Sequence, residues 1–251
     1  MTKPSQRIQK RLLGIAIVVL VTTCAFVGLR VYWHSYIPSQ REAARRATCQ
    51  NNLKHLVLVV WMYAKDHGGL APALAQTPGQ LALRDTETYR EVFPHYFTDP
   101  AVLQCPSEGT HFQKEVPPPL DVDYPTVADD RCYFYLGYAI NNQQELEDFA
   151  RAYRAEAGTE GAFDGELRIR DDDGIAITFP RLQPMNDDAA STPVFIERYP
   201  NGHIPRGGSV VYADGHVKWI AFGRKWPMTE EAMAVLMELD AMGARAAHAT
   251  L

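Results

Sequence analysis

An uncharged apolar run, Leu12–Leu29, constrains the folding of this chain more than any other feature. As a helix rising about 1.5 Å per residue, it is long enough to cross a hydrocarbon core of about 30 Å. Tyr32 and Trp33 follow it, as aromatic residues do at a membrane interface. A cleaved secretory signal is the alternative, and Thr22–Ala25 would be a poor cleavage site for it. We therefore predict a retained transmembrane helix over residues 12–33.

Charge is unevenly distributed on the two sides of this run. Residues 1–54 carry nine Lys and Arg and one acid, a net +8, which leaves −13 for the remainder of a chain whose net charge is −5. Residues 1–11 are basic and short, which favours a cytoplasmic N-terminus and a body outside the cytoplasm, although Arg30 and Arg41 also follow the span. We expect the lipid bilayer as a partner and, because the body is acidic, no nucleic acid.

A second helical segment follows the predicted span. Pro38 is expected to break or bend the first helix, and Ser39 and Glu42 have the spacing of a capping box. Apolar residues recur at helical spacing until Gly68 and Gly69, so an amphipathic helix is predicted over residues 39–67. We expect its apolar face to pack on the protein's own sheet; a coiled-coil seam or a docking surface is the alternative.

The sequence after the second helical segment predicts a mixture of strands and short helices. A short helix is predicted near residues 87–93, a proline-rich surface crossing at 115–125, and a core strand at 132–140. Asn142 should cap a helix reaching about Tyr153, residues 166–170 and 175–179 should form a hairpin, and Thr229 should begin a last helix. We therefore predict a basic tail at 1–11, a transmembrane helix at 12–33, an α+β domain at 34–226, and a C-terminal helix and tail at 227–251.

The segment GGSVVYADGHVKWI, residues 207–220, predicts a closing hairpin. With Asp214 and Gly215 as a two-residue type I′ loop, Tyr212 would face Val217, and Val210 would face Trp219. One face would then be apolar and the other partly wet. Asp214, Gly215 and Trp219 are accordingly interpreted as structural residues.

Few residue patterns in the chain indicate chemistry. Asp214, His216 and His203 could form a hydrolase site, but the predicted register implies no sheltered pocket for them. Motifs of zinc proteases, serine hydrolases, phosphate-binding loops and dinucleotide sites are absent, so we expect no enzyme. No CxxC pair or Cys/His spacing supports a zinc site. No cofactor is expected, and Ca²⁺ has only weak candidates: Asp171, Asp172, Asp173 and Asp214.

Several motifs together resemble a known bacterial group. They are Arg45-Arg46-x-x-Cys49-x-x-Asn52-Leu53-Lys54 with Tyr63, then LQCPSE around Cys105, GYAINN at 137–142, and the closing hairpin. In this order they resemble pilin-like proteins of the type II secretion pseudopilin class, which carry a prepilin-type N-terminus and a C-terminal His-x9-Asp-Gly segment. The chain departs from that pattern twice. Arg11–Ile15 replaces the prepilin cleavage motif, and ten residues separate His203 from Asp214.

The resemblance implies a pilin-like α+β fold, in which a long N-terminal helix, half membrane-spanning and half amphipathic, packs on a small antiparallel sheet. It also implies a disulfide between Cys49 and Cys105 and a structural role in a secretion or envelope assembly, with other pilin-like or secretion-system proteins as partners. The expected location is the bacterial inner membrane, single-pass, with the N-terminus inside and the body in the periplasm. A stand-alone anchored ligand- or Ca²⁺-binding module is the alternative function.

Overall fold

The computed structural model divides the chain into two compact units, Met1–Ala44 and Arg45–Leu251. The residues that it describes are 6–74, 79, 81, 92, 95–96, 100–103, 105–106, 132–157, 159, 163–170, 176–184, 186, 188–198 and 202–249. Three predicted features lie outside these residues: most of the helix at 87–93, the spacer at 115–125, and the acidic turn at 171–174.

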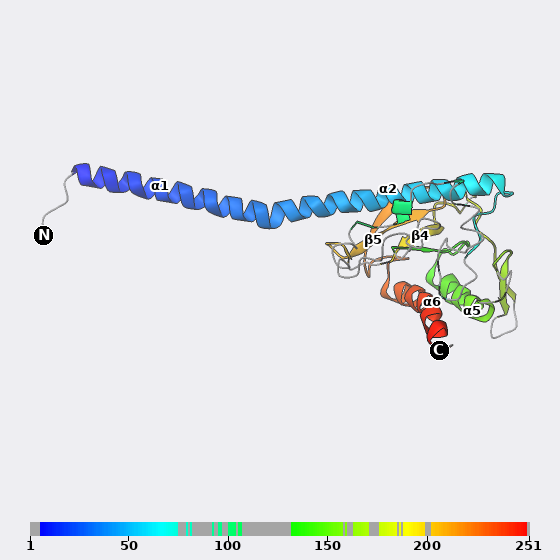
Figure 1. The fold of residues 1–251 in the computed structure, drawn as a ribbon. Helices are drawn as coiled ribbons and strands as arrows, with labels where there is room; N and C mark the ends of the chain where they lie inside the picture. Colours follow the sequence, from blue (N-terminus) through cyan, green and yellow to red (C-terminus); the bar gives the residue numbers. More distant parts are fainter. Residues whose placement is uncertain are drawn as a thin grey trace. The chain divides into compact units, whose positions relative to one another are not determined.

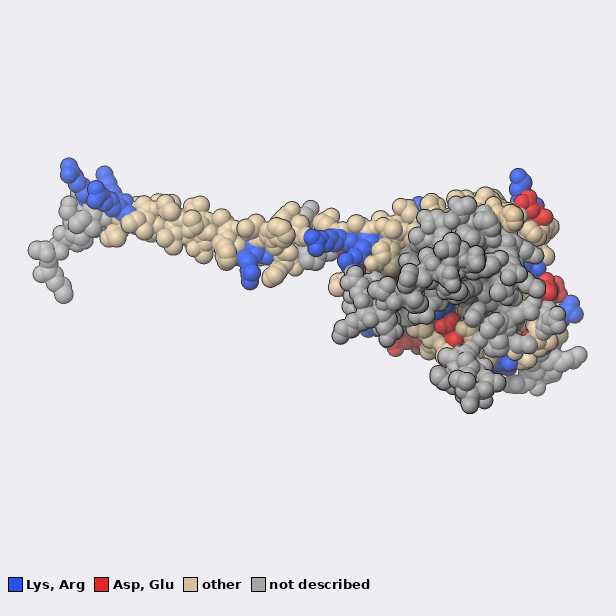
Figure 2. Space-filling model, in the orientation of Figure 1, with Lys and Arg blue, Asp and Glu red and all other residues tan. Residues whose placement is uncertain are grey.

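The N-terminal unit is built on one apolar helix. Helix α1 covers Gln6–Val31 and leads through a π-helical turn, η1 (Tyr32–Tyr36), into α2 (Ile37–Asp66). Large apolar side chains of α1 are exposed from Leu12 to Val31, and among the described residues this is the one helix long and apolar enough to cross a membrane. Figure 2 shows basic residues at both ends of its uncharged stretch.

Pro38 does not break the helix, and the helix start predicted at Ser39 is wrong. Helix α2 already begins at Ile37 and continues through Ser39 and Glu42, so these two residues do not form the predicted helix start. The backbone N–H of Ile37 donates to the carbonyl of Tyr32, five residues earlier, in the wider hydrogen-bond pattern of a π turn. Because proline lacks the N–H that a regular helix needs, a widened turn just before it lets the helix continue.

The second unit contains a four-stranded antiparallel sheet in the order β1-β4-β5-β6. Its strands are β1 (Tyr133–Tyr135), β4 (Pro193–Glu197), β5 (Gly207–Tyr212) and β6 (Val217–Ala221). A separate hairpin consists of β2 (Leu167–Arg170) and β3 (Ala176–Phe179). The remaining elements are η2 (Pro100–Leu103), α5 (Gln143–Glu156) and α6 (Glu230–Ala249). The α+β class with a long N-terminal helix and a C-terminal helix is therefore confirmed.

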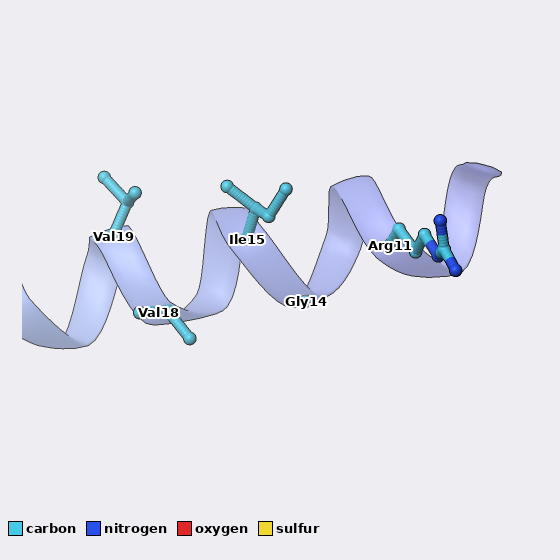
Figure 3. A pocket seen from close by; sticks show the side chains of 5 residues that line it. All are labelled: Arg11, Gly14, Ile15, Val18 and Val19. Carbon is cyan, nitrogen blue, oxygen red and sulfur yellow. The ribbon is translucent and has the colours of Figure 1, made fainter.

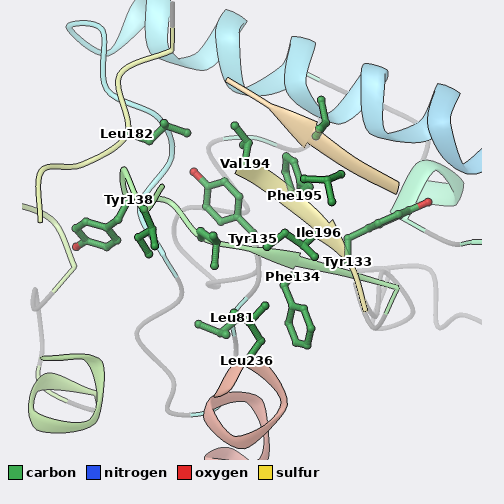
Figure 4. Close-up of a cluster of buried hydrophobic side chains, with 14 of the residues drawn as sticks. Leu81, Tyr133, Phe134, Tyr135, Tyr138, Leu182, Val194, Phe195, Ile196 and Leu236 are labelled. Atoms are coloured by element: carbon green, nitrogen blue, oxygen red, sulfur yellow. The ribbon is translucent and has the colours of Figure 1, made fainter. Parts of the chain in front are cut away.

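Helices cover both faces of the four-stranded sheet (Figure 1). The body part of α2 lies along one face, and α5 and α6 lie on the other. All residues of β1, β4 and β5 are buried. In Figure 4, Tyr133 and Tyr135 point to the α2 side of the sheet, whereas Phe134 points toward Leu236 of α6. Apolar side chains are therefore buried on both sides of the sheet, and together they form one hydrophobic core.

Local capping signals of the sequence are confirmed. The side chain of Asn142 accepts the backbone N–H of Glu145 at 3.0 Å, and Glu145 returns a bond to the N–H of Asn141 at 2.6 Å. Thr229 Oγ1 accepts the N–H of Ala232 at 3.1 Å at the start of α6. These contacts satisfy the otherwise unpaired N–H groups of a first helical turn, which explains why sequence alone located both helix starts.

The closing hairpin forms, but its predicted register is wrong by one residue. Val211 pairs with Val217, and Val210 pairs with Lys218 rather than with Trp219. The loop has three residues, Ala213–Gly215, and Gly215 adopts a positive φ of 85°. A three-residue loop that ends in a left-handed residue is a common hairpin connection, and it shifts every cross-strand pair relative to a two-residue loop.

Candidate functional site

Four buried side chains with metal-binding chemistry meet between α2 and the sheet. They are Cys49, Cys105, Glu197 and His203, and their ligand atoms all lie within 4.8 Å of one another. We call this group the buried cluster. Cys49 belongs to α2, Cys105 follows η2, Glu197 ends β4, and His203 lies in the connection between β4 and β5. Cys49, Cys105 and the pair Glu197 and His203 thus come from three parts of the chain that are distant in sequence.

Glu197 is the centre of the hydrogen bonds in the buried cluster. His203 Nε2 lies 2.6 Å from Glu197 Oε1, and Cys105 Sγ donates to the same oxygen at 2.9 Å. The distance from Cys105 Sγ to His203 Nε2 is 3.7 Å. Sulfur, imidazole nitrogen and carboxylate oxygen are the donor types found in protein zinc sites.

The buried cluster is almost completely shielded from solvent. The side chains of His203 and Glu197 are 1% and 2% exposed. A hydrogen bond with Cys49 and burial raise the pKa of the Cys105 thiol well above its ordinary value, while the hydrogen bond with His203 opposes the rise. Charged groups in such a place are stable only when they are paired or when they coordinate a metal.

The second carboxylate oxygen of Glu197 is held by the sheet. The backbone N–H of Ser209 in β5 donates to Glu197 Oε2 at 2.7 Å, which leaves Oε1 directed at Cys105 and His203. Gly208 provides the space for this arrangement. A Cβ at Gly208 would lie 2.5 Å from the methyl carbon of Met228 and 3.2 Å from Glu197 Cβ.

Aromatic residues surround the buried cluster. Trp219 meets the ring of His203 edge-on, with ring centroids 5.0 Å apart, and the guanidinium of Arg46 lies 5.0 Å from the Trp219 ring. Tyr133 is 1% exposed, and its hydroxyl has no hydrogen-bond partner among the described residues. Burial raises the pKa of Tyr133, and the negative charges that Cys49 and Glu197 can carry raise it further.

The disulfide implied by the family resemblance is not formed. None of the four cysteines forms a disulfide; Cys24 is exposed and the other three are buried. Cys49 and Cys105 do lie together as the resemblance implied, but the Cys105 thiol is hydrogen-bonded to Glu197 rather than oxidised. The proximity is therefore explained by a polar cluster of four residues and not by a cystine.

The structure separates the three residues considered for a hydrolase site. His216 Nδ1 lies 2.6 Å from Asp214 Oδ1 on the exposed hairpin loop, and the His216 ring stacks on Tyr212. His203 instead belongs to the buried cluster. The loop itself rests on α2, because Trp61 Nε1 donates to the carbonyl of Ala213 at 2.9 Å. The ring of Trp61 fills the space that a Cβ at Gly215 would need.

The other candidate positions are the four residues considered for calcium and a hollow on α1. Of the four calcium candidates, Asp171, Asp172 and Asp173 lie outside the described residues, and Asp214 accepts hydrogen bonds from His216. Figure 3 shows a shallow hollow on α1, lined by Arg11, Gly14, Ile15, Val18 and Val19. It lies on the exposed apolar surface of one helix, where lipid chains would fill it in a membrane.

Sequence reasoning missed the buried cluster because its members have no motif spacing. Cys49 and Cys105 were brought together only by the resemblance, and Glu197 was not singled out at all. The available signal was His203, which is separated from Asp214-Gly215 by ten rather than nine residues, together with an acidic residue six positions before it. Strand alternation shows whether a residue faces the core, but it does not show which distant side chains meet there.

Comparison with known proteins extends to part of the chain. A family model described as "Protein of unknown function (DUF1559)" matches residues 38–95, and this bacterial family is pilin- and pseudopilin-like. The match contains α2 from Pro38 onward, with Cys49, but not the other three residues of the buried cluster. No curated protein and no solved structure matches the chain. The family match and the single apolar N-terminal helix thus agree with a pilin-like protein.

Proposed function

We propose that this chain is a membrane-anchored, pseudopilin-like structural component of a bacterial secretion or envelope assembly, with its body in the periplasm. The observation that carries this proposal is the exposed apolar helix α1, which continues through η1 into α2 without an interruption of helical structure. The proposed role is structural and not catalytic. Other pilin-like or secretion-system proteins are the proposed partners.

The composition of α1 supports the anchor. Its exposed side chains from Leu12 to Leu29 carry no charge, and basic residues precede and follow them. In water this much exposed apolar surface would be unfavourable at about 25 cal/mol per Å², whereas in lipid it is not. The basic N-terminal flank favours the cytoplasmic side for that end.

The outer surface of α2 supports contact with another helix. Leu58 and Met62 are 46% and 44% exposed, and their spacing places them on one side of α2, away from the buried Leu56 and Val60. Exposed apolar residues one turn apart are typical of a surface that another helix covers. The alternative, a stand-alone anchored module, would leave this surface open to solvent.

Thiol labelling of whole cells tests the anchor and its orientation. In a Cys24→Ser background, one new cysteine is introduced at Lys225, which is exposed in the body, or at Lys10, which precedes the apolar run. A membrane-impermeant maleimide should label Lys225→Cys in cells with a permeabilised outer membrane and Lys10→Cys only after lysis. The reverse pattern would contradict the orientation, and recovery of the chain in the soluble fraction would contradict the anchor.

Photo-crosslinking in membranes tests the assembly role. A photoreactive residue at Leu58 should give adducts with a second copy or with another pilin-like protein. Met237, which is 38% exposed on α6, is the matched control position, where such adducts should be absent. Intact mass and N-terminal sequencing of the same preparation would show whether the span is processed. Monomer at both positions would favour the stand-alone module.

A further inference from the structure

We propose that Cys49, Cys105, Glu197 and His203 bind one Zn²⁺ ion, which fastens α2 to the sheet. The site would be structural, since all four coordination positions come from the protein and none is left for a substrate. This inference concerns the body of the chain and does not depend on the proposed assembly role. It is carried by the donor set, the distances within it, and the groups that surround it.

The donor set suits zinc better than calcium or magnesium. Two sulfurs, one imidazole nitrogen and one carboxylate oxygen form a mixed soft and borderline set, whereas Ca²⁺ and Mg²⁺ take oxygen ligands. Four such ligands at the corners of a tetrahedron are the usual arrangement of a structural zinc site. The ligand atoms of the buried cluster lie within 4.8 Å of one another, so one ion can reach them all.

The distances require only a small expansion on binding. From ordinary zinc–ligand lengths, a tetrahedral site places sulfur about 3.6 Å from nitrogen, and nitrogen about 3.4 Å from oxygen. Cys105 Sγ already lies 3.7 Å from His203 Nε2. His203 Nε2 and Glu197 Oε1 are 2.6 Å apart and share a hydrogen, so they must separate by under about 1 Å when the ion replaces that hydrogen.

The surroundings hold the ligands and provide one unused donor. Ser209 fixes Glu197 through Oε2, whereas Cys105 and His203 contact Oε1. The hydroxyl of Tyr133, which has no partner among the described residues, is available to donate to a zinc-bound thiolate. Such second-layer hydrogen bonds accompany most metal sites and tune them. A disulfide between Cys49 and Cys105 would remove both thiols from the buried cluster. The Tyr133 hydroxyl would then have no thiolate to which it could donate.

The charge balance is favourable for a buried site. Binding releases one proton from each thiol, and the hydrogen between His203 Nε2 and Glu197 Oε1 moves to His203 Nδ1 or to solvent. Zn²⁺ with two thiolates, one carboxylate and a neutral imidazole then carries a net charge of −1. Arg46 lies one helical turn before Cys49, on the same side of α2, with its guanidinium against Trp219, which in turn contacts His203. This guanidinium offsets the remaining negative charge.

Metal analysis of the whole protein is the first test. The full chain is extracted from membranes in detergent, without chelator, under anaerobic conditions, and with an affinity tag that lacks histidine and cysteine. We expect one zinc per chain. Replacement by Co²⁺ should give the visible spectrum of a tetrahedral ion and the charge-transfer absorption of thiolate ligands. Absence of bound metal, with or without a Cys49–Cys105 disulfide detected by mass, overturns the proposal.

Matched cysteine variants locate the ion. Cys105→Ser and Cys49→Ser should each lose the stoichiometric zinc and the thiolate absorption. Cys132→Ser, which alters a third buried cysteine next to β1, should keep both. If Cys132→Ser behaves like Cys105→Ser, or if all three variants keep the metal, the assignment is wrong. The wild-type cobalt spectrum remains decisive even if one variant fails to fold.

Tyr133→Phe tests the surrounding layer separately from the ligands. This variant removes the hydroxyl and preserves the ring, so the core should remain packed. Zinc affinity, measured by competition with a chromophoric chelator, should fall about 10–100-fold, while the stoichiometry stays at about one per chain at saturating zinc. An unchanged affinity would overturn the role given to the hydroxyl.

Discussion

Two histidine–carboxylate pairs in the body have the same separation and opposite surroundings. His203 Nε2 lies 2.6 Å from Glu197 Oε1, and His216 Nδ1 lies 2.6 Å from Asp214 Oδ1. The first pair is 1% and 2% exposed, whereas the second is 43% and 36% exposed. From these distances alone, the two pairs would be expected to contribute equally to stability. Burial makes the first pair part of the core and leaves the second on the surface of a loop.

The difference in burial sets what each pair contributes to stability. Removing one partner of a buried pair leaves a desolvated polar group without compensation, which costs about 3–5 kcal/mol. An exposed pair is screened by water and salt and contributes about 0–1 kcal/mol. We therefore expect the buried cluster to hold α2, the segment after η2 and the sheet together, and the His216–Asp214 pair to contribute little.

The largest effect is expected from breaking the buried pair. Glu197→Ala leaves His203, Cys105 and the N–H of Ser209 without their common acceptor, so the free energy of unfolding should fall by about 3–5 kcal/mol. Urea unfolding of the detergent-solubilised chain, followed by the fluorescence of Trp61, Trp219 and Trp226 in the body, measures this loss.

Asp214→Ala is the matched control for Glu197→Ala, because it removes the carboxylate of the exposed pair at the same histidine distance. It should cost less than about 1 kcal/mol. Equal losses in the two variants would contradict the comparison, and so would a loss below about 1 kcal/mol for Glu197→Ala.

An intermediate effect is expected where the exposed loop meets α2. Gly215→Ala forces a side chain into a positive φ of 85° and places its Cβ 2.6 Å from the Trp61 ring. We expect a loss of about 2–3 kcal/mol, of which backbone strain accounts for about 1 kcal/mol and the clash for the rest. Thermal unfolding of the solubilised chain measures it.

Gly223→Ala separates the two contributions at Gly215. Gly223 also has a positive φ, 76°, but nothing lies within 4 Å of the position that a Cβ would take there, so only strain should remain. If the two variants lose the same stability, the contact with Trp61 does not matter, and the loop is held by its own backbone.

Local features of the fold could be predicted, and long-range ones could not. The helix starts at Asn142 and Thr229, the hairpin of β2 and β3, and the location of the closing hairpin follow from residues within a few positions of one another. The register of the closing hairpin does not. The three-residue loop is supported by Trp61, 152 residues before Ala213, and no neighbouring residue indicates this contact.

The candidate site was less predictable than the fold for the same reason. Cys49, Cys105, Glu197 and His203 come from four segments, and their meeting requires the whole sheet and α2 to be in place. Asp214 and His216 were conspicuous because they flank a glycine in a short segment, yet the structure leaves them exposed. The short separation of Asp214 and His216 in the sequence therefore suggested a site, although this pair is the one exposed to solvent.

The smallest effect is expected at the exposed histidine. His216→Ala removes the hydrogen bond with Asp214 and the stacking on Tyr212, whose ring centroid lies 4.3 Å from that of His216. The loss in unfolding free energy should be below about 1 kcal/mol, because water competes for both contacts. Urea midpoints measured at low salt and at about 1 M salt separate the two contributions when the pH is low enough for His216 to be protonated, since salt then screens its attraction to Asp214 and leaves stacking in place. A large loss that disappears at high salt would mean that the exposed pair stabilises the loop electrostatically, and the contrast with His203 and Glu197 would then fail.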